Sequence, residues 1–333
     1  PAFAGMTAVE GLLQHPARAG WLTRFVGGVD NPPMKRSLVA SLSLFALLLP
    51  GCGTTAQDPV EPSTTTGTLV TSSLTFTSTV TGNPVAGARV VVAGTAYTTD
   101  TGGTIALSTP AAIGATIDAS APGFLERVTA FASVSALTLW EIPAGADVSY
   151  VRQLAYSRPG TAEILWRPTA ANLFLQLTGE LANEPAVRAA HVQAAAMATA
   201  MTGGRVTVQV GTPAAAGVTF TILLGPSSQG SATTYVTQSG GTIQGGRVEY
   251  PSAAAARDTR VIAHEIGHML GFGHAPFGLM CASSCGVDNF SPLEQQVFVS
   301  MWQRTPGTAA LDNDRRLLTG SSESTAVFSC DIS

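Results

Sequence analysis

The chain has 333 residues, a formal net charge of −4 and a charged fraction of 11%, whereas about 25% charged residues is usual for a soluble domain. This length has room for two modest domains. Because the chain is mildly acidic and carries no run of Lys and Arg, nucleic acid is excluded as an expected partner.

The first clear pattern begins at Met34. Residues 1–33 show no periodicity, and we interpret them as an over-extended start rather than a domain. After Met34-Lys35-Arg36, the apolar stretch Leu38–Leu49 is too short to span a bilayer as a mature helix. Cys52 follows directly, and residues 34–51 resemble a bacterial lipoprotein signal peptide. The resemblance implies cleavage before Cys52 and a lipid on that cysteine; the alternative is an ordinary secretory signal with an incidental cysteine.

The segment that follows the cysteine is predicted to be a tether. Residues 52–68 are rich in Pro, Ser, Thr and Gly, a composition typical of flexible linkers. The residue after Cys52 is Gly53 and not the aspartate that retains lipoproteins in the inner membrane of enterobacteria. The lipoprotein resemblance therefore implies a bacterial cell-envelope protein anchored in the outer membrane, with secretion as the alternative.

Residues 69–142 are predicted to form an all-β sandwich, because short β-rich runs alternate there with turn residues. The expected strands lie at residues 74–80, 88–92, 97–99, 115–119 and 137–142. Pro84–Val90, a Thr-Asp-x-x-Gly turn at Thr99 and Ala121–Phe124 resemble the carboxypeptidase-regulatory-like sandwich domains. The unit contains no histidine and no acidic cluster, so we assign no chemistry to it.

Residues 144–333 are predicted to form a second domain of mixed α and β structure. An Ala-rich helix is expected over 186–201, followed by strands at 205–210, 218–224 and 247–250. His191 lies on the expected helix, and we interpret it as a structural or surface residue.

The run from His264 to His274 reads H-E-x-x-H-x-x-G-x-x-H. On a helix, residues four apart lie on the same face, so His264 and His268 can reach one metal ion. Gly271 can adopt the left-handed conformation that ends a helix, which lets His274 supply a third nitrogen. Three imidazoles leave one position of a tetrahedral Zn²⁺ open, as in catalytic zinc sites. Glu265 lies beside them and can act as general base toward a metal-activated water.

The motif and the later Met280 together resemble the metzincin clan of zinc endopeptidases, in which a tight turn carries a methionine under the metal. The resemblance implies a mixed twisted sheet, an active-site helix, a C-terminal helix and a structural role for Met280. Ala275 and Ala282 depart from the residues frequent in several families of the clan, and a matrixin-type cysteine-switch segment is lacking. A matrixin-like bacterial protein is the interpretation that fits best.

The C-terminal helix is expected to begin at Ser291, where Ser, Pro and then Glu294 form a capping-box pattern.

If Cys52 is acylated, three cysteines remain, namely Cys281, Cys285 and Cys330. In an oxidising envelope we expect one disulfide among these three, with one thiol left over. Zinc binding by these cysteines is disfavoured, since three histidines and a water already complete a site.

Together these patterns predict a multidomain protein, with an all-β sandwich followed by an α+β metzincin-like zinc protease domain. The expected activity is zinc-dependent hydrolysis of peptide bonds in a protein or peptide substrate, in a protein held at the membrane by its lipid. One alternative is a non-enzymatic surface lipoprotein that binds a partner through its sandwich and has a degenerate protease domain. Another is a zinc hydrolase acting on a non-protein amide. The sequence predicts nothing about calcium.

Overall fold

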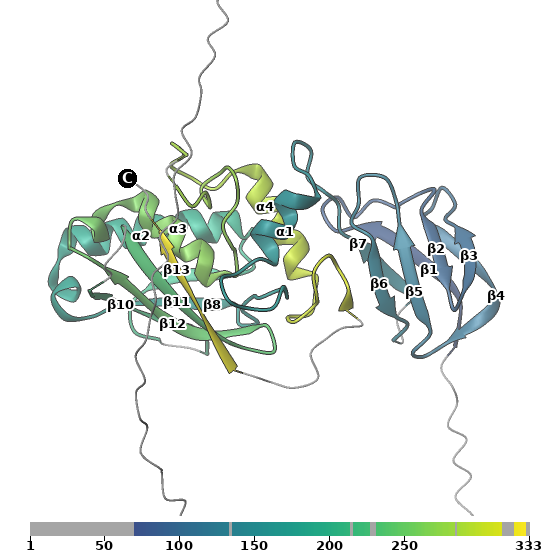
Figure 1. Ribbon diagram of the computed structural model, residues 1–333, viewed down its shortest axis with the longest axis horizontal. Coiled ribbons are helices and arrows are strands. Elements are labelled where there is room, and N and C mark those ends of the chain that lie inside the picture. The colour runs from purple at the N-terminus through teal and green to yellow at the C-terminus, as the bar shows by residue number, and fades with distance from the viewer. Residues whose placement is uncertain are drawn as a thin grey trace, which may run out of the picture. The chain divides into compact units, whose positions relative to one another are not determined.

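The computed structural model describes residues 70–132, 135–213, 216–226, 231–283, 285–314 and 323–330. The segment 1–33, the expected signal at 34–51, Cys52 and the tether at 52–68 lie outside these ranges. The described chain is mixed α/β, with mostly strands and few helices, which is compatible with a multidomain β-rich organisation (Figure 1). Among the described residues, no helix is long and apolar enough to cross a membrane.

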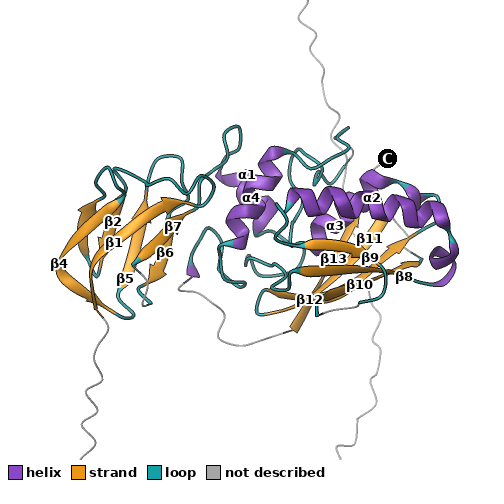
Figure 2. Ribbon diagram, turned by 180° about the vertical axis from the view of Figure 1, so that it is seen from behind, coloured by secondary structure: helices purple, strands orange, loops and turns teal. Residues whose placement is uncertain are grey.

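The N-terminal described part consists of two small sheets (Figure 2). The first has the order β4 (Thr104–Ala112), β1 (Val70–Ser78), β7 (Ala136–Leu139). The second has the order β3 (Thr95–Thr98), β2 (Arg89–Val92), β5 (Thr116–Ser120), β6 (Arg127–Ala130). Alternate residues of these strands are buried, as expected for sheets with one face toward a core. One hydrophobic cluster joins the two sheets through residues such as Phe76, Val90, Ile117 and Leu139.

The C-terminal part is built on a six-stranded sheet. Its strands lie in the order β13 (Glu323–Cys330), β11 (Ala232–Ser239), β12 (Thr242–Tyr250), β10 (Val218–Leu224), β8 (Asn172–Leu177), β9 (Thr207–Val210). β12, β10, β8 and β9 are parallel, whereas β11 and β13 run antiparallel to their neighbours. The antiparallel strands therefore form one margin of the sheet.

Within the described residues, four α-helices and two 3-10 helices accompany this sheet. They are α1 (Val148–Ala155), η1 (Gly179–Asn183), α2 (Pro185–Met201), η2 (Ala255–Arg257), α3 (Thr259–Met269) and α4 (Pro292–Trp302). α2 and α3 pack against each other, and α3 also contacts β11 and β12. The sequence patterns predicted α2, α3, α4 and β10, but they did not identify α1, β8, β11 or β13.

Helix α3 begins after a capping side chain and ends just before the glycine that the sequence suggested. The Asp258 side chain caps it by accepting hydrogen bonds from the backbone N–H groups of Arg260 and Val261, at 2.9 and 3.3 Å. The helix ends at Met269, and Gly271 has a φ of +103°. A Cβ atom at Gly271 would lie 2.0 Å from the backbone oxygen of Trp166, so only glycine fits this turn.

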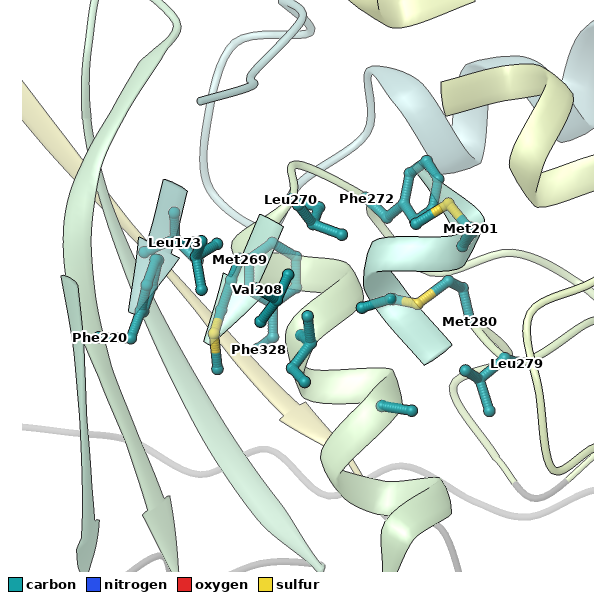
Figure 3. Close-up of a cluster of buried hydrophobic side chains, with 14 of the residues drawn as sticks. Leu173, Met201, Val208, Phe220, Met269, Leu270, Phe272, Leu279, Met280 and Phe328 are labelled. Carbon is teal, nitrogen blue, oxygen red and sulfur yellow. The ribbon is translucent and has the colours of Figure 1, made fainter. Parts of the chain in front are cut away.

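The hydrophobic core of the C-terminal part lies between the sheet and the helices. Figure 3 shows side chains of this core around α3, among them Met269, Phe272, Met280 and Phe328. Two residues that precede α1, Leu125 and Trp140, belong to this cluster and not to the smaller one. They are 2% and 0% exposed.

Buried polar contacts also link the two parts of the chain. Arg304 forms an ion pair with Asp312, both almost fully buried, and its guanidinium donates to the backbone and side-chain oxygens of Thr138 at 3.1 and 2.7 Å. The hydroxyls of Thr79 and Ser300 lie 2.7 Å apart. Removing one member of such a buried network leaves its partners unsatisfied, which costs stability.

We predict that Trp140→Ala lowers the free energy of unfolding by about 3 to 5 kcal/mol, the usual cost of removing a buried tryptophan. Its ring centroid lies 5.8 Å from that of Tyr156, inside the larger core. Urea unfolding followed by circular dichroism measures the change, with Thr98→Ala at an exposed position of β3 as control. An unchanged unfolding midpoint would show that Trp140 contributes no stability to the C-terminal part.

Candidate metal centre

The structure brings the three histidines of the motif together. α3 presents His264 and His268 one turn apart, with ring centroids separated by 4.8 Å. After the turn at Gly271, the His274 ring lies 5.4 Å from that of His264 and 4.8 Å from that of His268. The helix spacing and the glycine turn therefore produce the convergence that the sequence predicted.

Backbone carbonyls orient two of these rings. Nδ1 of His264 lies 2.7 Å from the oxygen of Leu279, and Nδ1 of His268 lies 2.9 Å from the oxygen of Phe272. A carbonyl oxygen can only accept, so Nδ1 carries the proton in both neutral rings. The lone pair of each Nε2 is then free to face the centre of the cluster, as in metal-binding histidines whose other nitrogen is held by a backbone carbonyl.

A fourth group, Cys330 at the end of β13, completes the cluster. Its Sγ lies 3.2, 3.4 and 3.5 Å from the Nε2 atoms of His264, His268 and His274. We expected Cys330 to be a disulfide partner or the thiol left over, and we disfavoured a metal-binding role for it. The structure leaves its thiol free, and it places that thiol among the three histidines, where it could bind a metal ion. The signal available in the sequence was the cysteine left over if Cys52 is acylated and two of the other three are bonded to each other.

The four side chains fit the requirements of a metal ion, and the cluster can hold one. Their ligand atoms all lie within 4.8 Å of one another. A tetrahedral zinc with bonds of about 2.0 Å to nitrogen and about 2.3 Å to sulfur has nitrogen–sulfur edges of about 3.5 Å. The three measured sulfur–nitrogen distances of 3.2 to 3.5 Å match that edge. Imidazole and thiolate donors are also the set that zinc prefers.

Burial keeps the imidazoles of this centre uncharged. It lowers the pKa of His264 to about 3, lowers that of His268 well below its ordinary value, and lowers that of His274. A cation cannot share a site with protonated imidazoles, and neutral imidazole is the form that binds metal. The apolar surroundings therefore prepare the three rings for ligation.

Glu265 lies at the same centre and is 0% exposed. Its Oε2 accepts a short hydrogen bond from the hydroxyl of Thr234 on β11, whereas its Oε1 has no protein partner. Burial raises the pKa of this carboxyl to about 7, against the opposing effects of the hydrogen bond from Thr234 and of the nearby Cys330 thiol. A metal ion beside it would favour the ionised form.

Met280 lies against Gly267 of α3, in a turn held by Glu294. The buried Glu294 carboxylate accepts from the backbone N–H of Met280 at 2.8 Å and from that of Ser291 at 2.6 Å. Ser291 and Glu294 form the predicted capping box, which is confirmed. A Cβ on Gly267 would lie 2.2 Å from the Met280 sulfur, so this glycine lets the turn pack against α3.

Arg158 supports the turn between the second and third histidines, a role that the sequence analysis missed. Its guanidinium is buried and donates to the backbone oxygen of Gly271 through a short hydrogen bond, and to that of Ala155 at 2.8 Å. Burial lowers its pKa to about 9. No motif indicated this residue, because the two partners are 113 residues apart.

The remaining candidates lie outside the cluster. Cys281 and Cys285 form a disulfide just after Met280, which leaves Cys330 as a free buried thiol among the described cysteines. His191 is buried on α2, where its Nδ1 lies 2.9 Å from the oxygen of Val187 and its ring packs edge-on against Tyr250. His191 is therefore not part of the metal cluster.

Comparison with known proteins adds no relative. No protein-family model matches this sequence, and no curated protein matches it.

We predict that the purified chain retains about one metal ion, and that His268→Ala abolishes this retention. The reason is that the His268 Nε2 lies within the four-ligand cluster. Metal content after dialysis is measured by mass spectrometry. His191→Ala, which also removes a buried helical histidine, should keep the metal. Full metal content in His268→Ala would refute the site.

Proposed function

We propose that this protein is a zinc-dependent endopeptidase of the metzincin-like, matrixin-like type. His264, His268 and His274 would hold one Zn²⁺ through their Nε2 atoms. The observation that carries the proposal is Glu265, a fully buried carboxylate beside the three imidazoles, with one oxygen bonded to Thr234 and the other free of protein partners. Burying a carboxylate oxygen without a hydrogen-bond partner costs free energy, and this cost favours a functional reason for the presence of Glu265.

The chemistry follows from the position of that carboxylate. Zn²⁺ bound to the histidines would supply a Lewis acid that polarises a peptide carbonyl and lowers the pKa of a water molecule. Glu265 would take one proton from the attacking water at its free Oε1 and then deliver that proton to the leaving amine. Thr234 would hold the other oxygen, so that the carboxylate stays oriented through both transfers.

A second candidate function has its own supporting observation. With Cys330 beside the three histidines, all four tetrahedral positions are filled by protein, as in structural zinc sites. The corresponding function is a non-enzymatic surface protein that binds a partner through its β-sandwich. We favour the peptidase, because a purely structural metal site needs only its four ligands and gives no reason for the buried Glu265 with its unpartnered oxygen.

We also propose that the protein is anchored in the bacterial cell envelope by a lipid on Cys52, with the outer membrane as its destination. The support is the sequence of residues 34–52, where a positive start, a short apolar stretch and a cysteine follow one another. Its substrates would be proteins or peptides that reach this surface.

Glu265→Gln is expected to retain the metal and to lose about 10²- to 10⁴-fold in the rate of peptide-bond hydrolysis, the usual contribution of a general base. Cleavage of a denatured protein mixture is followed with and without a chelator. Both the natural chain and a chain carrying Cys330→Ser are used, because Cys330 occupies the position that water needs. Glu180→Gln, at an exposed position, is the matched control.

Two results would contradict this assignment. Loss of metal from Glu265→Gln would indicate a ligand or structural role for Glu265. Unchanged hydrolysis by Glu265→Gln would show that another group is the base.

The anchor is tested on protein purified from bacterial membranes. We expect mass spectrometry to find Cys52 as the first residue, carrying at least two acyl chains, because one chain alone gives only marginal membrane binding. An unmodified N-terminus at another residue, on protein released into the medium, would exclude the anchor and leave secretion as the alternative.

A further inference from the structure

The margin of the large sheet nearest the metal centre is formed by two antiparallel strands. β11 carries Thr234, the residue that bonds Glu265. β13 pairs with β11 along its whole length, from Glu323 opposite Ser239 to Cys330 opposite Ala232. Without β13, β11 would be the edge of the sheet, with a row of free N–H and C=O groups.

A free edge of this kind is a binding site for an extended peptide. Peptides add to sheet edges as an extra strand, with main-chain hydrogen bonds for affinity and alternate side chains for specificity. A substrate bound to β11 in this way would run past Glu265 and the histidines, as β13 does here. β13 thus occupies the place that a peptide substrate would take.

The inward side chains of β13 cover the metal centre. Alternate residues Ala326, Phe328 and Cys330 are buried, whereas Val327 and Ser329 between them are exposed. The Phe328 ring stacks on His268, with centroids 4.0 Å apart and an angle of 13° between the planes. Cys330 Sγ lies within 3.5 Å of all three Nε2 atoms. One strand therefore blocks both the sheet edge and the fourth ligand position.

We propose that β13 is an inhibitory strand built into the chain, which keeps the enzyme latent by occupying the peptide-binding edge of β11 while the Cys330 thiolate fills the fourth metal position. The inference rests on the proposed peptidase function. On release, the Cys330 thiolate takes up one proton from solvent, and its position becomes open to water and substrate. No bond of the polypeptide is broken and no electron is transferred in this step.

The composition of β13 is compatible with dissociation of this strand from β11. Its outward side chains are exposed, and two side-chain hydrogen bonds join it to β11, between Gln238 and Ser324 at 2.6 Å and between Thr237 and Thr325 at 3.3 Å. Water can replace both of these contacts. Phe328 and Cys330 are the two residues that attach the strand to the metal centre.

The first experiment uses the full chain loaded with Co²⁺ in place of zinc. Thiolate ligation gives a ligand-to-metal charge-transfer absorption in the near ultraviolet, which imidazoles and water do not give. We expect this absorption in the natural chain, its loss in Cys330→Ser, and its retention in Ser329→Ala, the exposed neighbour on the same strand. The zinc-loaded Cys330→Ser chain should hydrolyse peptides about tenfold faster or more, because the open fraction of molecules sets the rate.

A second pair of variants weakens the strand without removing the thiol. Phe328→Ala loses the ring that stacks on His268, whereas Val327→Ala changes an exposed side chain of β13. Alkylation of Cys330 with iodoacetamide, followed by mass spectrometry, should be slow in the natural chain and in Val327→Ala. It should be faster in Phe328→Ala, and peptide hydrolysis should rise in the same variant.

The outcomes separate the inference from the function on which it rests. Equal hydrolysis by the natural chain and Cys330→Ser, without the charge-transfer absorption, would overturn the inhibitory strand and leave the peptidase intact. Loss of zinc from Cys330→Ser, with no hydrolysis by any variant, would identify a structural four-ligand site and overturn both. Equal alkylation rates in Phe328→Ala and Val327→Ala would show that Phe328 does not hold the strand closed.

Discussion

The metal centre depends on how closely the backbone around α3 approaches its neighbours. At Gly271 the chain reverses against the carbonyl of Trp166, and at Gly267 the helix lies directly against the sulfur of Met280. A side chain at either position would push these segments apart. The buried Arg158 holds the same turn from the other side, through the Gly271 oxygen. This close packing sets the third histidine against the first two.

The same packing controls the electrostatics of the site. Water is excluded from His264, His268 and Glu265, so burial works against every charge there. The imidazoles remain neutral and present Nε2 to the centre, because backbone carbonyls take the Nδ1 protons. The carboxyl of Glu265 remains poised between its two protonation states, with a pKa raised to about 7. A single physical cause, desolvation, thus acts on both the candidate metal ligands and the proposed general base.

β13 covers this site. In the same strand, a main-chain ladder covers β11, an aromatic ring stacks on His268, and the Cys330 Sγ lies 3.2 Å from Nε2 of His264. A four-ligand metal site is ordinarily structural, whereas an open three-ligand site is catalytic. Under the proposed inhibition, the chain would present the four-ligand arrangement while β13 is paired with β11, and the open arrangement after β13 dissociates.

What the sequence determined by itself is local. The i, i+4 histidines, the glycine at 271 and the capping box of Ser291 and Glu294 all act within a few residues, so their spacing specifies their geometry. Cys330, Thr234 and Arg158 reach the same centre from 62, 31 and 113 residues away from their partners. Only the pairing of β13 with β11 and the packing of the core decide those contacts. β13 has a weak pattern of its own, because its outward face carries the apolar Val327 and its inward face carries Ser324. Its pairing with β11 is made by backbone hydrogen bonds, which side-chain patterns do not encode.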